Sequence, residues 1–220
     1  MTKLSWTGFS KKTPQERKEH LKKNALLSQE NQDLLDKDQQ LTLETANQMA
    51  ENVIGRFTLP FAICPDVLVD GVTYQVPMVT EEPSVVAAAS YASKLIKRSG
   101  GFTTTIHDRQ MIGQVALFDV PDKDDASRKI QAASQNLIEI AKEAHPSIVK
   151  RGGGPRKLWT ETKGEFLIVY LAVDTQEAMG ANMVNTMMEA LVPELENLSK
   201  GQSLMAILSN LATESLVTAT

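Results

Sequence analysis

The alternation of apolar and polar residues divides the chain into two regions. Residues 57–77 alternate as β-strands do, and the Asp-Gly pair at 70–71 between two apolar runs predicts a hairpin. Residues 13–27 and 29–50 have helical spacing, and basic residues followed by glycines at 97–105 predict the end of another helix. We therefore expect a first region of helices and a β-hairpin that ends near residue 105, where we place a hinge.

A regular succession of elements follows this hinge. On the longest predicted helix, Ile130, Leu137, Ile138 and Ala141 form one apolar stripe that can face a sheet. The order strand-helix-strand-strand-helix-strand is typical of a ferredoxin-like unit, which is an antiparallel sheet with helices on one face. The expected strands are residues 110–120, 158–162, 166–174 and 203–211, and the expected helices are 124–144 and 179–198.

One stretch combines a predicted structural change with candidate chemistry. Residues 76–90, V-P-M-V-T-E-E-P-S-V-V-A-A-A-S, predict a strand, a sharp turn and the start of a helix. Glu81 and Glu82 lie at the turn, Pro83 fixes the backbone there, and Ser84 can bind the exposed helix amides. Acidic residues beside a helix N-terminus are often only partners of the helix dipole, so the pattern alone favours a structural role over a catalytic one.

Composition narrows the functional classes. The chain has 220 residues, enough for one or two domains, and its net charge of −4 gives no electrostatic reason to expect nucleic-acid binding. Cys64 is the single cysteine, which excludes an intrachain disulfide and fits a reducing, cytoplasmic setting. The N-terminal sequence lacks an apolar signal core, and no run approaches the ~20 apolar residues of a membrane span. The histidines and the cysteine form no metal-binding motif, so we expect no metal. For the reasons of charge and hydrophobicity given above, we also expect no nucleic-acid or membrane partner.

Three motifs stand out along the chain: E-N-V-I-G at 51–55, E-E-P-S at 81–84 and E-A-M-G-A-N at 177–182. Together they resemble hydroxymethylglutaryl-CoA reductase of the bacterial, soluble type, known as class II. The resemblance covers nearly the whole chain and ends at Thr220, which we expect to be near the middle of a full-length family member. In the family, E-N-V-I-G lies at a subunit interface, so the resemblance implies a homodimer or a higher oligomer.

The resemblance also implies an α+β fold with two domains. Residues 1–105 correspond to the N-terminal part of a large α/β domain for substrate and CoA. Residues 106–213 correspond to a small dinucleotide-binding domain inserted into it, with the ferredoxin-like β-α-β-β-α-β order, and residues 214–220 begin the return to the large domain. The periodicity alone also leads to the small domain.

The implied activity is that of an oxidoreductase of the mevalonate pathway, which reduces hydroxymethylglutaryl-CoA to mevalonate and coenzyme A with two molecules of NAD(P)H. Glu82 corresponds to the catalytic glutamate of the family, and Ser84 lies where the family contacts the hydroxymethylglutaryl group. The catalytic lysine, aspartate and histidine of the family lie in its second half, so we expect this chain alone to be inactive. The alternative is a non-catalytic binding or assembly fragment that acts through dimerisation.

E-A-M-G-A-N resembles the dinucleotide motif of the family, with Glu177 in place of the usual aspartate. Gly180 would let the backbone approach the cofactor, and the helix start near Met179 would offer amides to a diphosphate. The alternative is an ordinary helix that begins with glycine. The candidate cofactor-binding residues are His145, Lys150, Arg151, Glu177, Met179, Gly180, Asn182, Asn185 and Asn210.

The same resemblance predicts that NADPH is preferred and NADH tolerated. Family members that use NAD carry an aspartate seven residues before the triple glycine, where this chain has His145. Lys150 and Arg151 could bind the additional phosphate of NADPH. The alternative is that Lys150 and Arg151 end a solvated loop and that His145 is a cation at a helix C-terminus. We expect the glycines at 152–154 to form a mobile loop near the cofactor, since they do not fit the G-x-G-x-x-G fingerprint.

Overall fold

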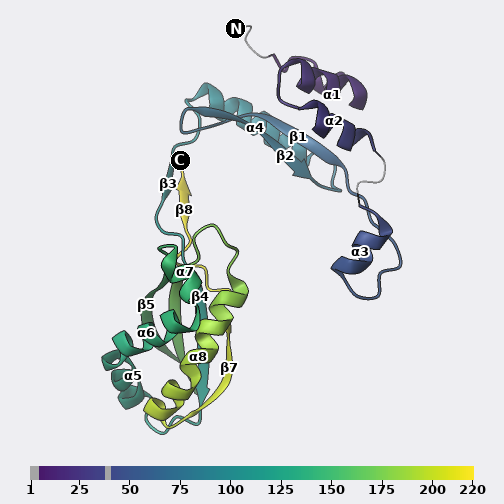
Figure 1. Cartoon of the computed structure of the whole chain (residues 1–220). Coiled ribbons are helices and arrows are strands. Elements are labelled where there is room, and N and C mark those ends of the chain that lie inside the picture. Colours follow the sequence, from purple (N-terminus) through teal and green to yellow (C-terminus); the bar gives the residue numbers. More distant parts are fainter. Residues whose placement is uncertain (1–4, 38–40) are drawn as a thin grey trace. The chain divides into compact units, whose positions relative to one another are not determined.

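A computed structural model describes residues 5–37 and 41–220 of the chain (Figure 1). The chain forms two compact units. The first holds the residues up to Thr103 together with Thr220, and the second is Thr104–Ala219. No helix in the described residues is long and apolar enough to cross a membrane.

The first unit begins with helical segments whose starts are set by side-chain caps. In α1, Thr13 and Glu16 form a reciprocal capping box, as the sequence T-P-Q-E allows. The single helix predicted for residues 29–50 is wrong, because two helices are present there. Thr42 starts the second of them by accepting a hydrogen bond from the Thr45 amide at 3.0 Å, and residues 38–40 lie outside the described part of the chain. The segments are η1 Phe9–Lys11, α1 Pro14–Lys23, α2 Gln29–Asp36 and α3 Leu43–Met49.

The predicted hairpin is confirmed. Strands β1 (Phe61–Val69) and β2 (Val72–Val79) pair in antiparallel fashion, and Asp70 and Gly71 make the turn with φ values of 48° and 80°. Helix α4 (Val85–Arg98) packs on β1, where the buried Cys64 thiol lies 3.6 Å from the Ser93 hydroxyl. The glycines at 100 and 101 end this helix with positive φ, as predicted.

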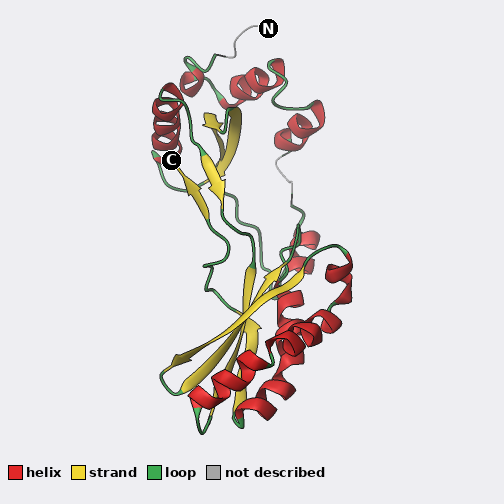
Figure 2. Ribbon diagram, turned by 90° about the vertical axis from the view of Figure 1, so that its left-hand side faces the viewer, coloured by secondary structure: helices red, strands yellow, loops and turns green. Residues whose placement is uncertain are grey.

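The second unit is built on a four-stranded antiparallel sheet in the order β5-β6-β4-β7. Helices α5, α6 and α8 contact this sheet and lie on one side of it (Figure 2). The main core lies between the two layers and includes Leu117, Val169 and Met187, all completely buried. The strands are β4 Met111–Phe118, β5 Gly154–Lys163, β6 Phe166–Asp174 and β7 Gln202–Leu208, and the helices are α5 Lys123–Ala132, α6 Ser134–Ala144, α7 Pro146–Lys150 and α8 Ala181–Ser199.

The sequence located these elements better than it located their ends. The helix predicted at 124–144 is two helices that meet at Ala133, and α7 was not predicted. The apolar stripe predicted for residues 124–144 nevertheless faces the core, because Ile130, Leu137 and Ala141 are completely buried. Strand β5 begins at Gly154, several residues earlier than expected.

A second, smaller sheet was not predicted. Strand β3 (Thr104–Ile106) pairs in antiparallel fashion with β8 (Val217–Ala219), which brings the two ends of this unit side by side. The His107 ring adds a hydrogen bond of 2.7 Å to the Thr218 hydroxyl. The segment after β7 therefore returns to the point where the unit began.

Candidate active site

The turn between β2 and α4 holds the two adjacent carboxylates. Its conformation is fixed by the Thr80 hydroxyl, which accepts a hydrogen bond of 3.1 Å from the Glu82 amide. Ser84 then precedes the helix with a left-handed backbone, φ 72°, and makes no capping hydrogen bond within the described residues. The prediction that its hydroxyl binds the helix amides is therefore wrong. Caps that do accept, such as Thr13, have an extended backbone instead.

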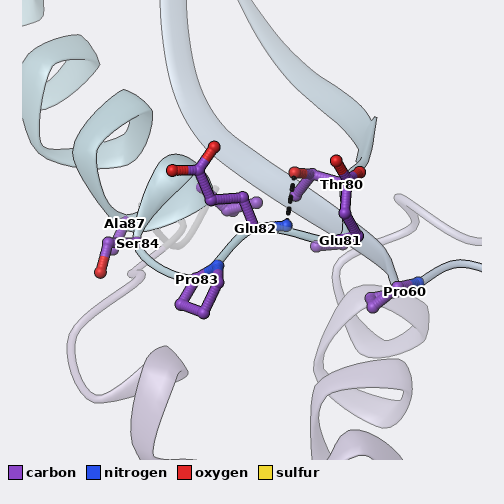
Figure 3. Close-up of a pocket in the computed structure, with 9 residues that line it drawn as sticks. Pro60, Thr80, Glu81, Glu82, Pro83, Ser84 and Ala87 are labelled. Atoms are coloured by element: carbon purple, nitrogen blue, oxygen red, sulfur yellow. Dashed lines mark hydrogen bonds between the residues drawn. The ribbon is translucent and has the colours of Figure 1, made fainter.

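A shallow pocket of about 330 Å³ lies over this turn (Figure 3). In the view of Figure 3, the carboxylates of Glu81 and Glu82 project to the same side of the turn, and the Ser84 hydroxyl points away from them. Both carboxylates are exposed. The pocket is lined by Pro60, Ala62, Thr80, Glu81, Glu82, Pro83, Ser84, Val86 and Ala87.

The start of α8 is shaped by one glycine. Gly180 precedes the helix with φ 83°, a conformation that residues with a side chain rarely adopt. A Cβ atom at this position would also lie 2.4 Å from Cγ2 of the buried Thr175. The glycine therefore lets the loop 175–180 fold tightly against the end of β6. The first amides of α8 have no acceptor within the helix, and the positive end of a helix dipole favours an anion there.

The motif residues around Gly180 have different surroundings. Met179 is 76% exposed and Asn182 is exposed. The Glu177 carboxylate pairs with the Arg109 guanidinium at 3.2 Å, a contact at the start of β4 that the sequence did not predict. Asn185 is partly buried, and its Oδ1 accepts a hydrogen bond of 2.8 Å from the Leu208 amide, which holds α8 against β7.

The predicted phosphate-binding residues lie on α7 and the turn that follows it. His145 precedes this short helix, and its Nδ1 is 3.2 Å from the Ser147 hydroxyl. Lys150 and Arg151 are exposed, and Arg151 donates through Nε to the Ser147 carbonyl at 3.2 Å. The exposed side chains leave their charges available to an anion.

Of the glycines at 152–154, Gly153 and Gly154 are buried, whereas a Cβ added to the exposed Gly152 would meet no described atom within 4 Å. The mobility of this loop stays a prediction. Gly154 is the first residue of β5. A Cβ on Gly153 would lie 2.6 Å from the Asp174 carbonyl oxygen and 2.8 Å from the Ile148 side chain. These close approaches bring the turn against the end of β6, where the loop 175–180 begins.

A charged pair that the sequence did not reveal joins the same two segments. The Arg156 guanidinium lies 2.8 Å from the Asp174 carboxylate, and this hydrogen bond, more than any other contact, holds the pKa of that carboxyl below its usual range. No sequence motif marks the pair, because Arg156 belongs to β5 and Asp174 to β6. A search for the partner of Asp174 across the β5–β6 hairpin could have found Arg156.

The sheet therefore gathers most predicted cofactor residues at one edge. The antiparallel pairs Gly154–Asp174, Met111–Val173 and Gly113–Leu208 place the start of β5, the end of β6, the start of β4 and the end of β7 together. Asn210, which is exposed, follows β7 at this edge. No group of three metal-binding side chains occurs among the residues that the structure describes.

Comparison with known proteins defines the class to which this fold and site belong. A solved structure from Streptococcus pneumoniae, "class II 3-hydroxy-3-methylglutaryl-CoA reductase … bound to NADPH in open conformations", superposes on 98% of this chain with a TM-score of 0.93 and 63% identity. The sequence profile of the family "Hydroxymethylglutaryl-coenzyme A reductase" matches residues 13–220. The chain therefore belongs to the hydroxymethylglutaryl-coenzyme A reductase family, and the resemblance seen in its motifs is confirmed.

Two further relatives agree. The 3-hydroxy-3-methylglutaryl-coenzyme A reductase of Archaeoglobus fulgidus is 41% identical over 209 residues, which are 93% of this chain and 48% of that protein. A probable reductase from Borreliella burgdorferi is 31% identical over 74% of this chain and 37% of its own length. The chain covers 59% of the Streptococcus pneumoniae chain, so it spans about half the length of its relatives.

Proposed function

We propose that this chain contributes the cofactor site and one catalytic acid to an NADPH-dependent hydroxymethylglutaryl-CoA reductase of the mevalonate pathway. The observation that carries the proposal is the gathering of the E-A-M-G-A-N loop and the basic residues of α7 at one sheet edge. The related Streptococcus pneumoniae structure is that of a reductase bound to NADPH, which supports the choice of cofactor. The strand order β5-β6-β4-β7 supports the ferredoxin-like type for the small domain, which we assign to residues 106–213 within a large domain that begins with residues 1–105 and resumes at 214–220.

The residues at the sheet edge fit a dinucleotide diphosphate. Gly180 allows a close approach to the start of α8, where helix amides and the dipole favour negative charge. Glu177, Met179, Asn182, Asn185 and Asn210 would surround the ligand from the loop, the first turns of the helix and the end of β7. Bound NADPH would supply the hydride.

Lys150 and Arg151 would select NADPH over NADH. Both are exposed at the end of α7, and a guanidinium can donate two parallel hydrogen bonds to a phosphate. His145 is not acidic and so does not repel this phosphate, whereas an acid would favour the free ribose hydroxyls of NADH. NADH would still bind through the diphosphate contacts that the two cofactors share.

Glu82 would act as the proton donor. Reduction of a thioester to an alcohol adds two hydrides to one carbon, breaks the C–S bond, and requires protons for the departing CoA thiolate and for the new alkoxide. A carboxylic acid within reach of these atoms can deliver a proton as the charge develops. Ser84 would contact the hydroxymethylglutaryl group.

The test is an assay of NADPH oxidation with hydroxymethylglutaryl-CoA, run on this chain and on the chain extended to the length of its relatives. We expect turnover, with release of mevalonate and coenzyme A, only in the extended protein. An extended protein that folds but neither binds NADPH nor oxidises it would overturn the proposal.

A second candidate function is assembly through dimerisation, and one observation favours it. In the first unit, Ile54 of E-N-V-I-G is fully exposed and Phe57 is 88% exposed. Exposed apolar groups of this size commonly mark interaction surfaces. Light scattering of the parent chain and of Ile54→Ser tests it: we expect self-association of the parent and a shift toward monomer in the variant, and two monomeric proteins would remove this candidate.

A further inference from the structure

Two segments at the sheet edge carry different parts of the proposed cofactor site. Lys150, Arg151 and the turn 152–154 lead into β5, which begins at Gly154, and the loop 175–180 follows β6. The pairing of Gly154 with Asp174 makes them neighbours. Their backbones touch closely, because a Cβ on Gly153 would lie 2.6 Å from the Asp174 carbonyl oxygen and 3.0 Å from the Gln176 side chain.

Arg156 lies at an irregular point of this pairing. Pro155 pairs with Val173 and Lys157 pairs with Ala172, so Arg156 is the extra residue of a β-bulge. A bulge redirects a side chain out of the regular alternation of a strand. Here the guanidinium reaches back along the strand to the turn that precedes it, since its Nη2 donates to the Gly152 carbonyl at 2.6 Å.

The same nitrogen binds the second segment through Asp174. Arg156 Nη2 donates to Asp174 Oδ2 at 2.8 Å. Asp174 in turn accepts two hydrogen bonds of 2.9 Å from Gln176, one from its backbone amide and one from its side-chain amide. Gln176 has a left-handed backbone, φ 53°, which these contacts support. One arginine–aspartate pair thus fixes the backbone of both segments.

We propose that Arg156 and Asp174 are positioning residues of the cofactor site, and we call the pair the Arg156–Asp174 clamp. The inference rests on the proposed dinucleotide function. The clamp holds the turn that carries Lys150 and Arg151 at a fixed place relative to the start of α8, so that one ligand can contact both. A site whose segments are already ordered loses less conformational freedom when the ligand binds.

A positioning role for Arg156 and direct binding of the additional phosphate of NADPH predict different effects on cofactor affinity. Arg156 Nη2 already makes both clamp contacts, and the pair is only partly exposed, with 42% of the arginine and 25% of the aspartate side chain accessible. A positioning role affects the segment that binds the diphosphate, which NADPH and NADH share. Loss of a ligand to the additional phosphate would instead weaken NADPH alone.

The experiment measures the affinity of the whole chain for NADPH and for NADH by calorimetric titration. The variants are Arg156→Met and Arg156→Lys, and the matched control is Arg128→Met, which removes an exposed arginine 3.4 Å from Asp125 on α5. We expect Arg156→Met to weaken both cofactors about tenfold and Arg128→Met to leave both unchanged. Arg156→Lys retains the charge without the planar fork, so we expect it to recover only part of the loss.

Amide hydrogen exchange gives an independent readout. Because the clamp joins two segments, Arg156→Met should raise exchange in residues 174–180 as well as in 150–154, although the substitution lies in β5. The melting temperature should fall only slightly near neutral pH, by the small contribution of one partly exposed ion pair. A general structural defect would instead lower the melting temperature and raise exchange throughout the unit.

The outcomes separate the two proposals. Weakening of NADPH alone would make Arg156 a phosphate ligand and overturn the clamp, as would unchanged affinity and exchange in Arg156→Met. If the parent chain binds neither cofactor in either titration, the cofactor role of the clamp fails, and the assay of the extended protein decides separately whether the proposed function stands. Exchange at 174–180 then decides whether the pair still joins the two segments.

Discussion

The substitution Gly180→Ala tests how the loop before α8 is held. It adds a single methyl group, but the backbone has φ 83° and the new Cβ would lie 2.4 Å from Thr175 Cγ2 and 2.8 Å from Thr175 Cβ. Thr175 cannot easily move, because it is buried and its hydroxyl donates to the Ala178 carbonyl at 3.0 Å. The substitution therefore combines backbone strain with steric overlap.

Each contribution has an approximate size. A left-handed backbone costs a residue with a side chain about 1–2 kcal/mol, and overpacking in a tight site costs about 1–3 kcal/mol. We therefore expect Gly180→Ala to lower the unfolding free energy of the second unit by roughly 2–5 kcal/mol. The sequence offers one control for each contribution.

Gly164→Ala provides strain without overlap, because φ is 62° at the β5–β6 turn and no described atom lies within 4 Å of the added Cβ. Gly201→Ala provides overlap without positive φ, with Val120 Cγ2 at 2.6 Å and the Phe118 carbonyl oxygen at 2.7 Å. We expect each control to cost less than Gly180→Ala. Thr175→Ser should restore part of the stability of Gly180→Ala, because it removes the closest methyl group and keeps the hydroxyl.

The assay is urea unfolding followed by tryptophan fluorescence. The chain has two tryptophans, so a Trp6→Phe background leaves Trp159 in β5 as the reporter of the second unit. If Gly180→Ala lost no more stability than Gly164→Ala, the contact with Thr175 would cost nothing and the steric part of the reasoning would be refuted. Equal losses with and without Thr175→Ser would lead to the same conclusion.

Three further predictions concern charge. In the full-length enzyme, Glu82→Gln should retain substrate affinity and lower kcat by about 10²–10⁴-fold, and turnover close to that of the parent would exclude Glu82 as the acid. Lys150→Ala and Arg151→Ala should each reduce the NADPH-to-NADH ratio of kcat/KM by about tenfold, and an unchanged ratio in both would place the phosphate elsewhere. The Arg156 hydrogen bond lowers the pKa of Asp174 in the folded protein from its ordinary 3.8. The ionised pair should therefore stabilise the fold fully above pH 3.8, and this stabilisation should be lost as the pH falls through the lowered pKa of the folded state. The stability difference between the parent and Arg156→Met should therefore shrink in acid, and a constant difference in urea titrations at several pH values would contradict this.

Local signals in the sequence were sufficient for several elements. The hairpin at Asp70 and Gly71 was predicted because a two-residue turn with positive φ needs such residues. Strand β6 (Phe166–Asp174) was predicted with its observed bounds, because a continuous apolar run fits a strand buried on both faces. In both cases the residues that decide the structure are adjacent in sequence.

The helices show where such signals stop. Helical periodicity continues from α2 to α3, and only the capping hydrogen bond of Thr42 marks the start of the second helix. The helical conformation is interrupted at Ala133, between α5 and α6, although no glycine or proline lies there. Both helices pack against β5 and α8, so tertiary packing decides this break and periodicity cannot show it.

The candidate site was predicted by motif, and its internal contacts were not. The motif match placed Gly180 at the start of a helix. The structure explains why a glycine is needed there, since φ is positive and Thr175 lies too close for a side chain. The Arg156–Asp174 clamp depends on the register of β5 with β6 and on a bulge within it. A bulge changes the alternation of a strand by one residue, and nothing in the local sequence specifies where it falls.

Asn185 shows how a motif match and a structural contact can belong to one residue. Its carbonyl oxygen accepts the Leu208 amide at 2.8 Å and so satisfies a backbone donor of β7, the edge strand of the sheet. That contact alone accounts for an amide side chain at this position. A carboxamide can accept at Oδ1 and donate at Nδ2 at the same time, however, so a cofactor acceptor could use the second group while the first holds the strand. The side chain that binds β7 would then also bind the ligand. Ligand binding would therefore stabilise the contact between α8 and the edge strand β7, and this contact would in turn hold Asn185 in place for the ligand.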